Sequence, residues 1–598
     1  MSFHPNEVVR RARAASFIVA GAIVYLLAAF FRTQILHHDE WVLQSEDNRL
    51  RQVPIPAPRG IIVDRKGLII AENVVSYSVS MLAKNESELR STIARLVELI
   101  PMSAKSIEDA VKRHRRDTAR PTAIFPDASF GQVARLEEHR LDFPGLIIQM
   151  APRRIYPDGR AVGAFVGYTI EINEAELAAR QDLGYRGGQQ IGKTGLEEAY
   201  ESTLRGREGS RFVEVDAMGR VMREEGARAD LRPISGRELK TNIDLDLQRF
   251  IYNLFGDSLV GGAVALDPQT GAVLAIHTAP SLDPNRFIGG APVAYIDSLN
   301  ADKRRPQYHK ALQGRYAPGS TFKLATAVLG LESGTITMKD RMPQPCSGSY
   351  YFGNRSWRCW EPKGHGSIDL AGAIKHSCDV YFYQLGLKLT LARLSAGGVA
   401  LGFTQRTGID LPGENRPIWA DTKYLDDKYG QGKWINAASA TGEALNLAIG
   451  QGSNSQTVLS MARFYAALAT DGSEPDSFRI AQRPNKRVKM INLSQAQLLQ
   501  LRTAMEGVTR EGGTAASAAL EGVLIAGKTG TAQSGVFVKD IEQNHAWFAG
   551  IAPSVDPKIV VVVMLEFGGH GTRAARIASA IIGHYLHAKS IWNLGDQG

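Results

Sequence analysis

The sequence predicts an α+β protein in which one membrane helix precedes two folded domains. An uncharged apolar run occupies residues 14–31, and strand-like and helical segments are mixed over 33–235. Strand-like segments stand at both ends of 236–598, with helices between them, which is typical of a single α+β domain. At 598 residues the chain is long enough to bury more than one core.

The apolar run at 14–31 is about the minimum length for a membrane-spanning helix. Arginines precede it at three positions: Arg10, Arg11 and Arg13. They predict a cytoplasmic tail over 1–13 and export of the chain beyond the helix. A cleaved signal peptide is the alternative, because the run is short. No small-residue cleavage site follows, so we expect an uncleaved transmembrane helix over 14–32.

Residues 33–235 are expected to form a mixed α and β region. The prolines of QVPIPAPRG (52–60) predict an extended segment, and 61–72 reads as two short strands around a turn at Asp64–Gly67. Residues 88–140 are charge-rich and helical in texture, and LIIQM (146–150) is strand-like. We identify no nucleophile–base pair in this region.

Residues 236–598 are expected to form the second domain. The pattern predicts a strand, a helix cap and an amphipathic helix over 239–255, and a β-hairpin over 261–279 with a turn at Asp267–Gly271. Two strands and a closing helix are predicted near the C-terminal end, at 546–553, 558–567 and 575–587.

YAPGSTFKLATAVLGLE (316–332) is the strongest functional stretch. Pro318-Gly319 predicts a turn, and Ser320 follows it where a helix would begin. Lys323 lies three residues further on, on the same helix face. A serine hydroxyl needs a base, and a lysine serves if burial and neighbouring cations lower its pKa. The helix N-terminus also favours a developing oxyanion. Alone, S-x-x-K predicts only a helix cap with a surface lysine.

Two further motifs follow S-x-x-K in an order that favours a catalytic role for it. Ser377-Cys378-Asp379 lies within a segment predicted to be helical, and AGKTGTAQ (526–533) follows a strand-like VLIA. Penicillin-binding proteins and β-lactamases carry S-x-x-K, S-x-N-type and K-T-G elements in this order. On an edge strand, Lys528 and Gly530 would share one face, and Gly530 would let a substrate backbone approach closely.

With these motifs, the chain from about 59 to 585 resembles the class B penicillin-binding proteins, most of all those of the rod-shape elongation machinery. The pedestal motifs are RGIIVDRKG (59–67), RRIYPDGRAVGAFVGY (153–168) and GLEEAYESTLRG (195–206). The transpeptidase motifs are TNIDLDLQ (241–248), PSLDPNRF (280–287), APGSTFK, KTGTAQ and HAWFAG (545–550). The resemblance implies a mixed α/β pedestal, or dimerisation-type, domain over 33–235. It implies a penicillin-binding/β-lactamase-like transpeptidase domain over 236–598.

The resemblance also implies roles for matching residues. Ser320 would accept the acyl group, with Lys323 as its general base. Ser377 would relay protons toward the leaving amine, and Asp379 would order Ser377 and Lys323. Many relatives have Asn at the position of Asp379, whereas elongation-type sequences often have Asp.

On the K-T-G strand, Lys528 would supply positive charge to the site and to the substrate carboxylate. Thr529 and Thr531 would bind that carboxylate, and the N–H groups of Ser320 and Thr531 would form the oxyanion hole. A second K-T-G, Lys193-Thr194-Gly195, precedes the nucleophile and leads into LEEAYE. We interpret this copy as a loop at a helix start.

All three cysteines lie in one window with a histidine: Cys346, Cys359, His365 and Cys378. Three thiolates and one imidazole are a complete tetrahedral set for structural zinc, although the spacing is not that of a zinc finger. A Cys346–Cys359 disulfide with a buried Cys378 is an alternative in an exported domain, as are three unrelated thiols. Bound zinc would have no catalytic role. On a helix, Ser377 and Asp379 would face the nucleophile while Cys378 points to the metal behind them.

These features predict a single-pass protein of a bacterial inner membrane with its catalytic domain in the periplasm. Ser320 would attack the penultimate D-Ala carbonyl of a peptidoglycan stem peptide and release D-Ala. An amine of a neighbouring stem would then resolve the acyl-enzyme, with D,D-carboxypeptidase activity as a side reaction, and β-lactams would acylate Ser320. The resemblance implies two partners, a membrane glycosyltransferase of the rod-shape family and a periplasmic elongation scaffold.

Three alternatives stay open at this point. A septal class B transpeptidase would use the same chemistry, although the Cys/His window and S-x-D favour elongation. A β-lactamase is less favoured, because we find no deacylating glutamate motif. A noncatalytic β-lactam sensor or wall-binding scaffold would be acylated without turning over stem peptides. The net charge of +9 is compatible with an anionic membrane or wall polymer, and nothing in the sequence indicates a nucleic-acid partner.

Overall fold

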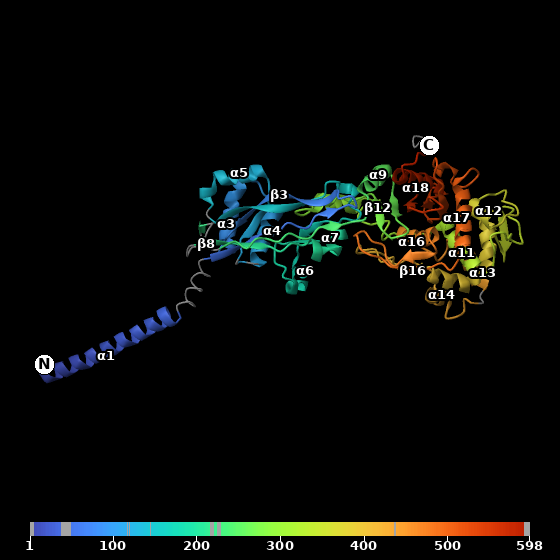
Figure 1. Cartoon of the computed structure of the whole chain (residues 1–598). Coiled ribbons are helices and arrows are strands. Elements are labelled where there is room, and N and C mark those ends of the chain that lie inside the picture. Colours follow the sequence, from blue (N-terminus) through green and yellow to red (C-terminus); the bar gives the residue numbers. More distant parts are fainter. Residues whose placement is uncertain are drawn as a thin grey trace.

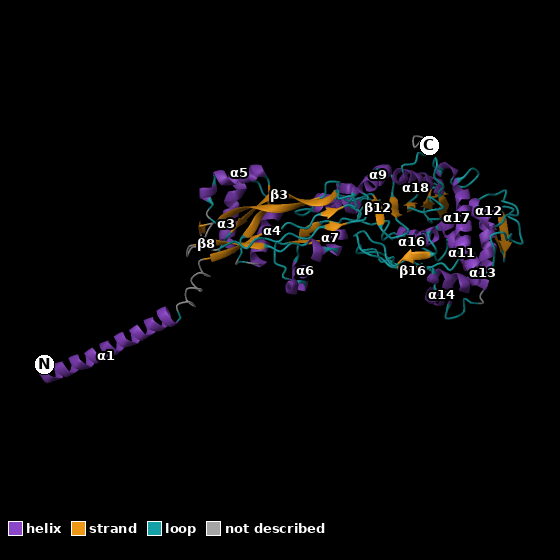
Figure 2. Cartoon of the chain, viewed as in Figure 1, coloured by secondary structure: helices purple, strands orange, loops and turns teal. Residues whose placement is uncertain are grey.

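The computed structural model describes residues 5–37, 50–116, 118, 120–143, 145–215, 221–223, 229–435 and 438–590. The molecule is elongated, with helix α1 at one end, a pedestal in the middle and the C-terminal domain at the other end (Figure 1). Long strands dominate the pedestal, and most helices lie in the C-terminal domain (Figure 2).

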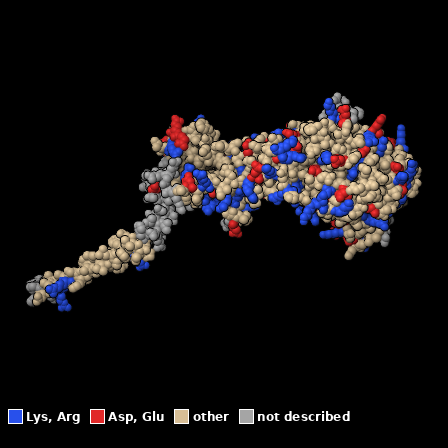
Figure 3. All heavy atoms as spheres, viewed as in Figure 1, with Lys and Arg blue, Asp and Glu red and all other residues tan. Residues whose placement is uncertain are grey.

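Helix α1 (Pro5–Phe31) continues into a short π-helix, Arg32–Leu36. The stretch Val8–Leu36 is long and apolar enough to cross a membrane, and its most apolar part is not buried against the rest of the described chain. The expected N-terminal apolar helix is therefore present, and it begins earlier than residue 14. Basic side chains gather at its N-terminal end, whereas basic and acidic side chains are interspersed over the folded domains (Figure 3).

Strand β3 (Ile69–Met81) is the central strand of the larger pedestal sheet, where it pairs with three other strands. The sheet around it contains β2 (Ile62–Val63), β4 (Thr122–Ala128), β5 (Leu146–Ile155) and β10 (Leu239–Lys240). A second sheet contains β1 (Leu50–Ile55), β8 (Gly209–Val215) and β9 (Val221–Arg223). The predicted strands on either side of Asp64–Gly67 and the predicted strand at 146–150 are confirmed.

The expectation of a helical region over 88–140 is right only in part. Three helices lie there: α3 (Glu86–Leu99), α4 (Ala104–Arg116) and α5 (Phe130–Glu138). Strand β4 crosses between α4 and α5, and its residues Ile124 and Ala128 are buried in the pedestal core. The charged residues of the flanking helices dominate the local composition and hide this short strand.

A buried ion network accounts for the charged residues of the pedestal motifs. Glu197, fully buried in α7 (Gly195–Ala199), accepts hydrogen bonds from Arg59 and, at 2.7 Å, from Arg154 Nε. Tyr156 Oη donates to the same carboxylate at 3.2 Å. Burial opposes ionisation of Glu197, but the two guanidinium groups hold its pKa below the usual value.

A five-stranded antiparallel sheet forms the core of the C-terminal domain, in the order β12-β11-β21-β20-β17. Its strands are β11 (Gly261–Leu266), β12 (Val273–Ala279), β17 (Ala526–Ala532), β20 (His545–Ala552) and β21 (Ile559–Leu565). Strands from both ends of the predicted domain therefore meet in one sheet, as expected. The K-T-G strand β17 lies at its edge.

Both faces of this sheet are covered, because every residue of β21 and nearly every residue of β20 is buried. Helices α16 (Val458–Ala469) and α18 (Gly571–Leu586) both contact β20 and β21. Helix α9 (Leu245–Phe255) follows β10 and begins at an Asp244 cap, as the sequence predicts. The predicted closing helix is α18, which begins earlier than residue 575.

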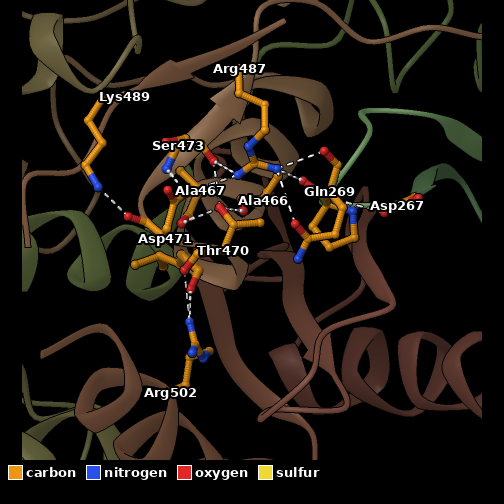
Figure 4. Close-up of polar contacts among 12 residues, drawn as sticks. Asp267, Gln269, Ala466, Ala467, Thr470, Asp471, Ser473, Arg487, Lys489 and Arg502 are labelled. Carbon is orange, nitrogen blue, oxygen red and sulfur yellow. Dashed lines mark hydrogen bonds and ion pairs between the residues drawn. The ribbon is translucent and has the colours of Figure 1, made fainter. Parts of the chain in front are cut away.

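Two arginines join neighbouring segments of this domain through hydrogen bonds to backbone carbonyl oxygens (Figure 4). Arg502, from α17 (Gln495–Thr509), donates to the carbonyl oxygens of Leu468 and Thr470 at 2.9 and 3.2 Å. Helix carbonyls at a C-terminal end lack partners within the helix, so this arginine satisfies the end of α16. Arg487 joins Ser473 O and Gln269 O, at 2.9 and 2.8 Å.

Side-chain contacts also join the pedestal to the C-terminal domain. His309 Nε2 donates to Ala164 O at 2.8 Å. Tyr200 Oη donates to Asp410 at 2.6 Å, and the same carboxylate accepts the N–H of Ile480 at 2.7 Å. The catalytic candidates described next therefore lie in a domain that is fixed to the pedestal at several points.

Candidate active site

Ser320 lies at the start of the helical segment that the sequence predicts. A short 3-10 helix, Gly319–Phe322, runs directly into α11 (Lys323–Glu332). Ser320 is half-buried, and Gly319 before it has a φ of +52°, which favours glycine. Phe322 is fully buried against Phe403 and Trp419, so the turn is anchored in the core.

Lys323 is fully buried, and its Nζ contacts both residues that the sequence assigns to it. Lys323 Nζ donates to Ser377 O at 2.7 Å, to Ser377 Oγ at 3.2 Å and to Asp379 Oδ1 at 2.8 Å. The structure therefore brings S-x-x-K and S-C-D together, with the buried Lys323 side chain between the Ser377 hydroxyl and the Asp379 carboxylate.

The segment around Ser377 is not the continuous helix that we expected. Helix α12 (Leu370–Lys375) stops, and α13 (Asp379–Ala400) begins after a break. Ser377 has a φ of +54°, which is strained for a residue with a side chain and is typical of functional sites. Despite this break, Ser377 and Asp379 both reach Lys323, as we expected of a continuous helix.

Asp379 has a second partner that could not be predicted from the sequence. The backbone N–H of Trp360 donates to Asp379 Oδ2 at 3.1 Å, while Oδ1 faces Lys323. Trp360 Nε1 donates to His376 O at 2.9 Å, beside Ser377. Trp360 directly follows Cys359, so the cysteine window contacts the catalytic candidates.

The K-T-G motif lies on β17, where Lys528 is fully buried and Thr529 nearly so. Burial, and then the charge of Lys323, hold the pKa of Lys528 well below its ordinary value, while Asp379 opposes this effect. Lys528 Nζ donates to Thr529 O at 3.2 Å. The two lysines thus share one site, and adding a second positive charge there is unfavourable.

The remaining groups of the strand have partners from outside the motif. Thr529 Oγ1 lies 2.8 Å from Thr514 Oγ1, and the N–H of Gly571 donates to Thr531 Oγ1 at 3.3 Å. Neither Thr514 nor Gly571 stands in a motif that we recognised. A Cβ added at Gly530 would lie 2.8 Å from Pro318 O, so the nucleophile turn itself requires glycine there.

The cysteine window forms one cluster. Cys346, Cys359 and Cys378 are free and buried, and their sulfur atoms and His365 Nδ1 all lie within 4.8 Å of one another. The sulfur atoms of Cys346 and Cys359 are each 3.6 Å from His365 Nδ1. With Zn–S near 2.3 Å and Zn–N near 2.0–2.1 Å, tetrahedral coordination places sulfur and nitrogen about 3.5 Å apart. The four residues fit a zinc ion.

The second K-T-G lies far from this site in the pedestal. Lys193 and Thr194 lie between β7 (Gln190–Gly192) and α7, which is the loop at a helix start that we expected. Around Ser320, the site combines a hydroxyl, two buried lysine amines, a second serine hydroxyl and a strand edge. That set can form and resolve an acyl-serine ester.

Two domain families match the sequence. Residues 261–583 match the penicillin binding protein transpeptidase domain, and residues 54–241 match the penicillin-binding protein dimerisation domain. Among similar proteins, peptidoglycan D,D-transpeptidase MrdA of Acinetobacter baumannii is 30% identical, with 95% of this chain and 86% of that protein covered. MrdA of Escherichia coli K12 is also 30% identical, with 97% and 94% covered.

Solved structures of penicillin-binding proteins are also similar to this chain. PBP2 of Helicobacter pylori in complex with MreC matches with a TM-score of 0.77 at 25% identity, over 90% of this chain and 99% of that one. PBP2 of Pseudomonas aeruginosa in complex with WCK 5153 matches with a TM-score of 0.66 at 29% identity, over 91% and 100%. Both likenesses cover the pedestal together with the C-terminal domain.

Proposed function

This chain belongs to the penicillin-binding protein transpeptidase family, and from that premise we propose that Ser320 is its nucleophile. The chain is a peptidoglycan D,D-transpeptidase of the elongation type, like the MrdA proteins to which it is similar over nearly its full length. One observation carries the residue assignment. The buried Lys323 amine lies three residues from Ser320 and within hydrogen-bond distance of Ser377 and Asp379.

In the proposed acylation, Ser320 Oγ attacks the penultimate D-Ala carbonyl carbon, and Lys323, in its neutral amine form, takes the Oγ proton. The N–H groups of Ser320 and Thr531 receive the negative charge on the carbonyl oxygen. The C–N bond then breaks, the leaving D-Ala amine takes a proton relayed through Ser377, and an ester remains. An amine of a second stem peptide attacks this ester, loses a proton and frees Ser320.

Lys528 has a proposed role that depends on substrate. Its pKa is lowered by burial and by Lys323, so its charge is costly in the free enzyme. A substrate carboxylate beside Lys528 would raise the pKa again, because an opposite charge favours the protonated form. Thr529 and Thr531 would bind the same carboxylate through their hydroxyl groups.

We propose that Cys346, Cys359, His365 and Cys378 hold a structural zinc ion. Zinc with four protein ligands has no open position for chemistry, so its contribution is to fix the surrounding chain. Through the Trp360 N–H, the fixed segment would hold the Asp379 carboxylate in place. One zinc ion per purified chain is the expected result of a metal analysis.

We further propose that α1 anchors the protein in the inner membrane, with the folded domains in the periplasm. The arginines at the start of α1 support this orientation. The similarity to a PBP2 that was solved with MreC supports a periplasmic scaffold of that kind as a partner. A membrane glycosyltransferase as the second partner is supported by a likeness, at a TM-score of 0.71, to a chain of a peptidoglycan synthase complex that coordinates polymerisation and crosslinking.

Covalent labelling tests the assignment. The full-length protein in detergent is incubated with benzylpenicillin and measured by intact mass, beside Ser320→Ala. A single penicilloyl adduct in the wild type, absent from the variant, together with crosslinking of stem peptides, is the expected result. Labelling of Ser320→Ala would contradict the nucleophile. Labelling of the wild type without any turnover of stem peptides would support a noncatalytic sensor or scaffold.

A further inference from the structure

A buried carboxylate from the end of the sheet holds the segment that precedes the nucleophile. Tyr316 lies four residues before Ser320, and its Oη donates to Glu566 Oε1 at 2.6 Å. Glu566 directly follows β21, and its side chain is only 7% exposed. An ionised carboxylate only accepts hydrogen bonds, so the phenol is the donor. Burial and the Glu566 charge raise the pKa of Tyr316, which keeps the phenol protonated.

The Tyr316 ring lies between the nucleophile segment and the strands of the site. It meets the His545 ring edge-on at 5.1 Å and the Trp547 ring at 6.5 Å. His545 and Trp547 lie on β20, opposite Ala532 and Gly530 of β17. Position and tilt of the ring are therefore set by the strand pair that carries K-T-G-T.

Strained backbone surrounds the Tyr316–Glu566 pair. Phe567, next to Glu566, has a φ of +53°, and its N–H donates to His545 Nδ1 at 3.2 Å. Arg305 has a φ of +52°, and its Nη2 donates to Glu566 Oε1 at 3.3 Å. Residues with side chains keep such conformations only where their surroundings impose them. The strain on both sides of Glu566 indicates that its position is tightly determined.

The nucleophile turn and β17 are packed so closely that their separation has no room to change. A Cβ added at Gly319 would lie 2.8 Å from Thr531 O, and one added at Gly530 would lie 2.8 Å from Pro318 O. The nucleophile turn and β17 thus touch backbone to backbone. Any shift of the turn changes the position of Ser320 relative to the Thr531 N–H.

We propose that Tyr316 and Glu566 are positioning residues that fix the separation between Ser320 and the Thr531 N–H. This inference rests on the proposed function, because it assigns catalytic roles to Ser320 and Thr531. Tyr316 and Glu566 act through the backbone of residues 316–320. Loosening the pair therefore lowers the rate of acylation at saturation and leaves the affinity for the acylating compound nearly unchanged.

The test measures the concentration dependence of benzylpenicillin acylation with the full-length protein, which separates the maximal rate constant from the half-saturating concentration. Tyr316→Phe keeps the ring and removes the donor, and we expect its maximal rate constant to fall ~10–100-fold, since small displacements are costly for catalysis. Glu566→Gln keeps an acceptor oxygen and should stay within about threefold of the wild type, whereas Glu566→Leu should resemble Tyr316→Phe.

Tyr156→Phe is the matched control. Tyr156 is buried, and its Oη donates to a buried glutamate at 3.2 Å, but the pair lies in the pedestal. We expect this variant to lower Tm without changing the acylation rate constant. The rate is measured at a temperature at which every variant is folded, so a general loss of stability would not mimic the effect.

The outcomes separate this inference from the proposed function. An unchanged rate constant in Tyr316→Phe, or a drop no larger than that in Tyr156→Phe, would overturn the positioning role while Ser320 acylation stands. If Tyr316→Phe does not fold, the comparison of Glu566→Gln with Glu566→Leu decides, and equal rates would overturn the proposal. A wild-type protein without an adduct on Ser320 would refute the proposed function, and the positioning role with it.

Discussion

Replacing Gly530 with alanine tests how closely β17 must approach the nucleophile turn. The added Cβ would lie 2.8 Å from Pro318 O, 3.0 Å from Thr321 Cγ2 and 3.1 Å from Trp547 Cβ. Two of these three atoms belong to the turn that carries Ser320. The third belongs to β20, which pairs with β17 and leaves the new methyl group no direction in which to move.

The size of the effect follows from these distances. Non-bonded carbon atoms are most stable about 3.5–4.0 Å apart, so the turn has to move by ~0.5–1 Å to admit the methyl group. Overpacking of this kind lowers the free energy of unfolding by ~1–3 kcal/mol. A displacement of about 1 Å can reduce a rate ~100-fold. We therefore expect Gly530→Ala to lower the maximal acylation rate constant ~10–100-fold and to stay folded.

The assay is the saturation kinetics of benzylpenicillin acylation, with Gly131→Ala as control. Gly131 lies in α5, and a Cβ added there has no atom within 4 Å. Alanine should stabilise that helix by ~0.5–1 kcal/mol and leave acylation unchanged. The sequence suggested instead that Gly530 admits a substrate backbone, which predicts weaker binding with an unchanged maximal rate. That result, or wild-type kinetics, would refute the reasoning from the turn.

Three further outcomes are expected. Ser320→Ala should abolish the penicilloyl adduct seen by intact mass while changing the free energy of unfolding by less than ~0.5 kcal/mol, because it removes one half-exposed hydroxyl. Cys378→Ser should remove zinc from the purified protein and lower Tm and the acylation rate together; unchanged melting would argue against an anchoring metal. The folded-state pKa of Lys528 lies below its unfolded value of 10.5, so the unfolded chain binds that proton more readily at neutral pH. Lys528→Met should therefore raise the free energy of unfolding at pH 7, with a gain that shrinks as the pH approaches 10.5, and it should abolish activity.

Local patterns were sufficient to predict those parts of the structure that depend on neighbouring residues. The apolar run became α1, the hairpin at 261–279 became β11 and β12, and the Asp244 cap begins α9. The structure also brings S-x-x-K and S-C-D together at Lys323, whose charge lowers the pKa of Lys528 in K-T-G. Their roles stay proposals until the variants are measured.

Contacts between residues far apart in the sequence could not be predicted in this way. Tyr316 and Glu566 are separated by 250 positions, and no sequence motif indicates that they contact each other. The break at Ser377 was missed because a strained φ leaves no mark on composition. Strand β4 was missed because only Ile124 and Ala128 among its residues are buried and apolar, within a strongly charged region. In each case tertiary packing decided a conformation for which the local sequence is neutral.

The position of the thiols in one short window has a physical explanation in this geometry. Cys378 stands between Ser377 and Asp379, and Cys359 stands directly before Trp360, whose N–H holds Asp379 Oδ2. Two ligands of the proposed zinc ion are thus sequence neighbours of groups that orient the Asp379 carboxylate. Cys378 directly precedes Asp379 itself, and Cys359 directly precedes Trp360. If Cys378 were the only ligand near the site, metal binding would leave the strained Ser377 segment free to rotate. The hydrogen bond from the Trp360 N–H to Asp379 opposes that rotation. Metal binding and orientation of the proton relay are therefore expected to be lost together, even though zinc takes no part in the chemistry.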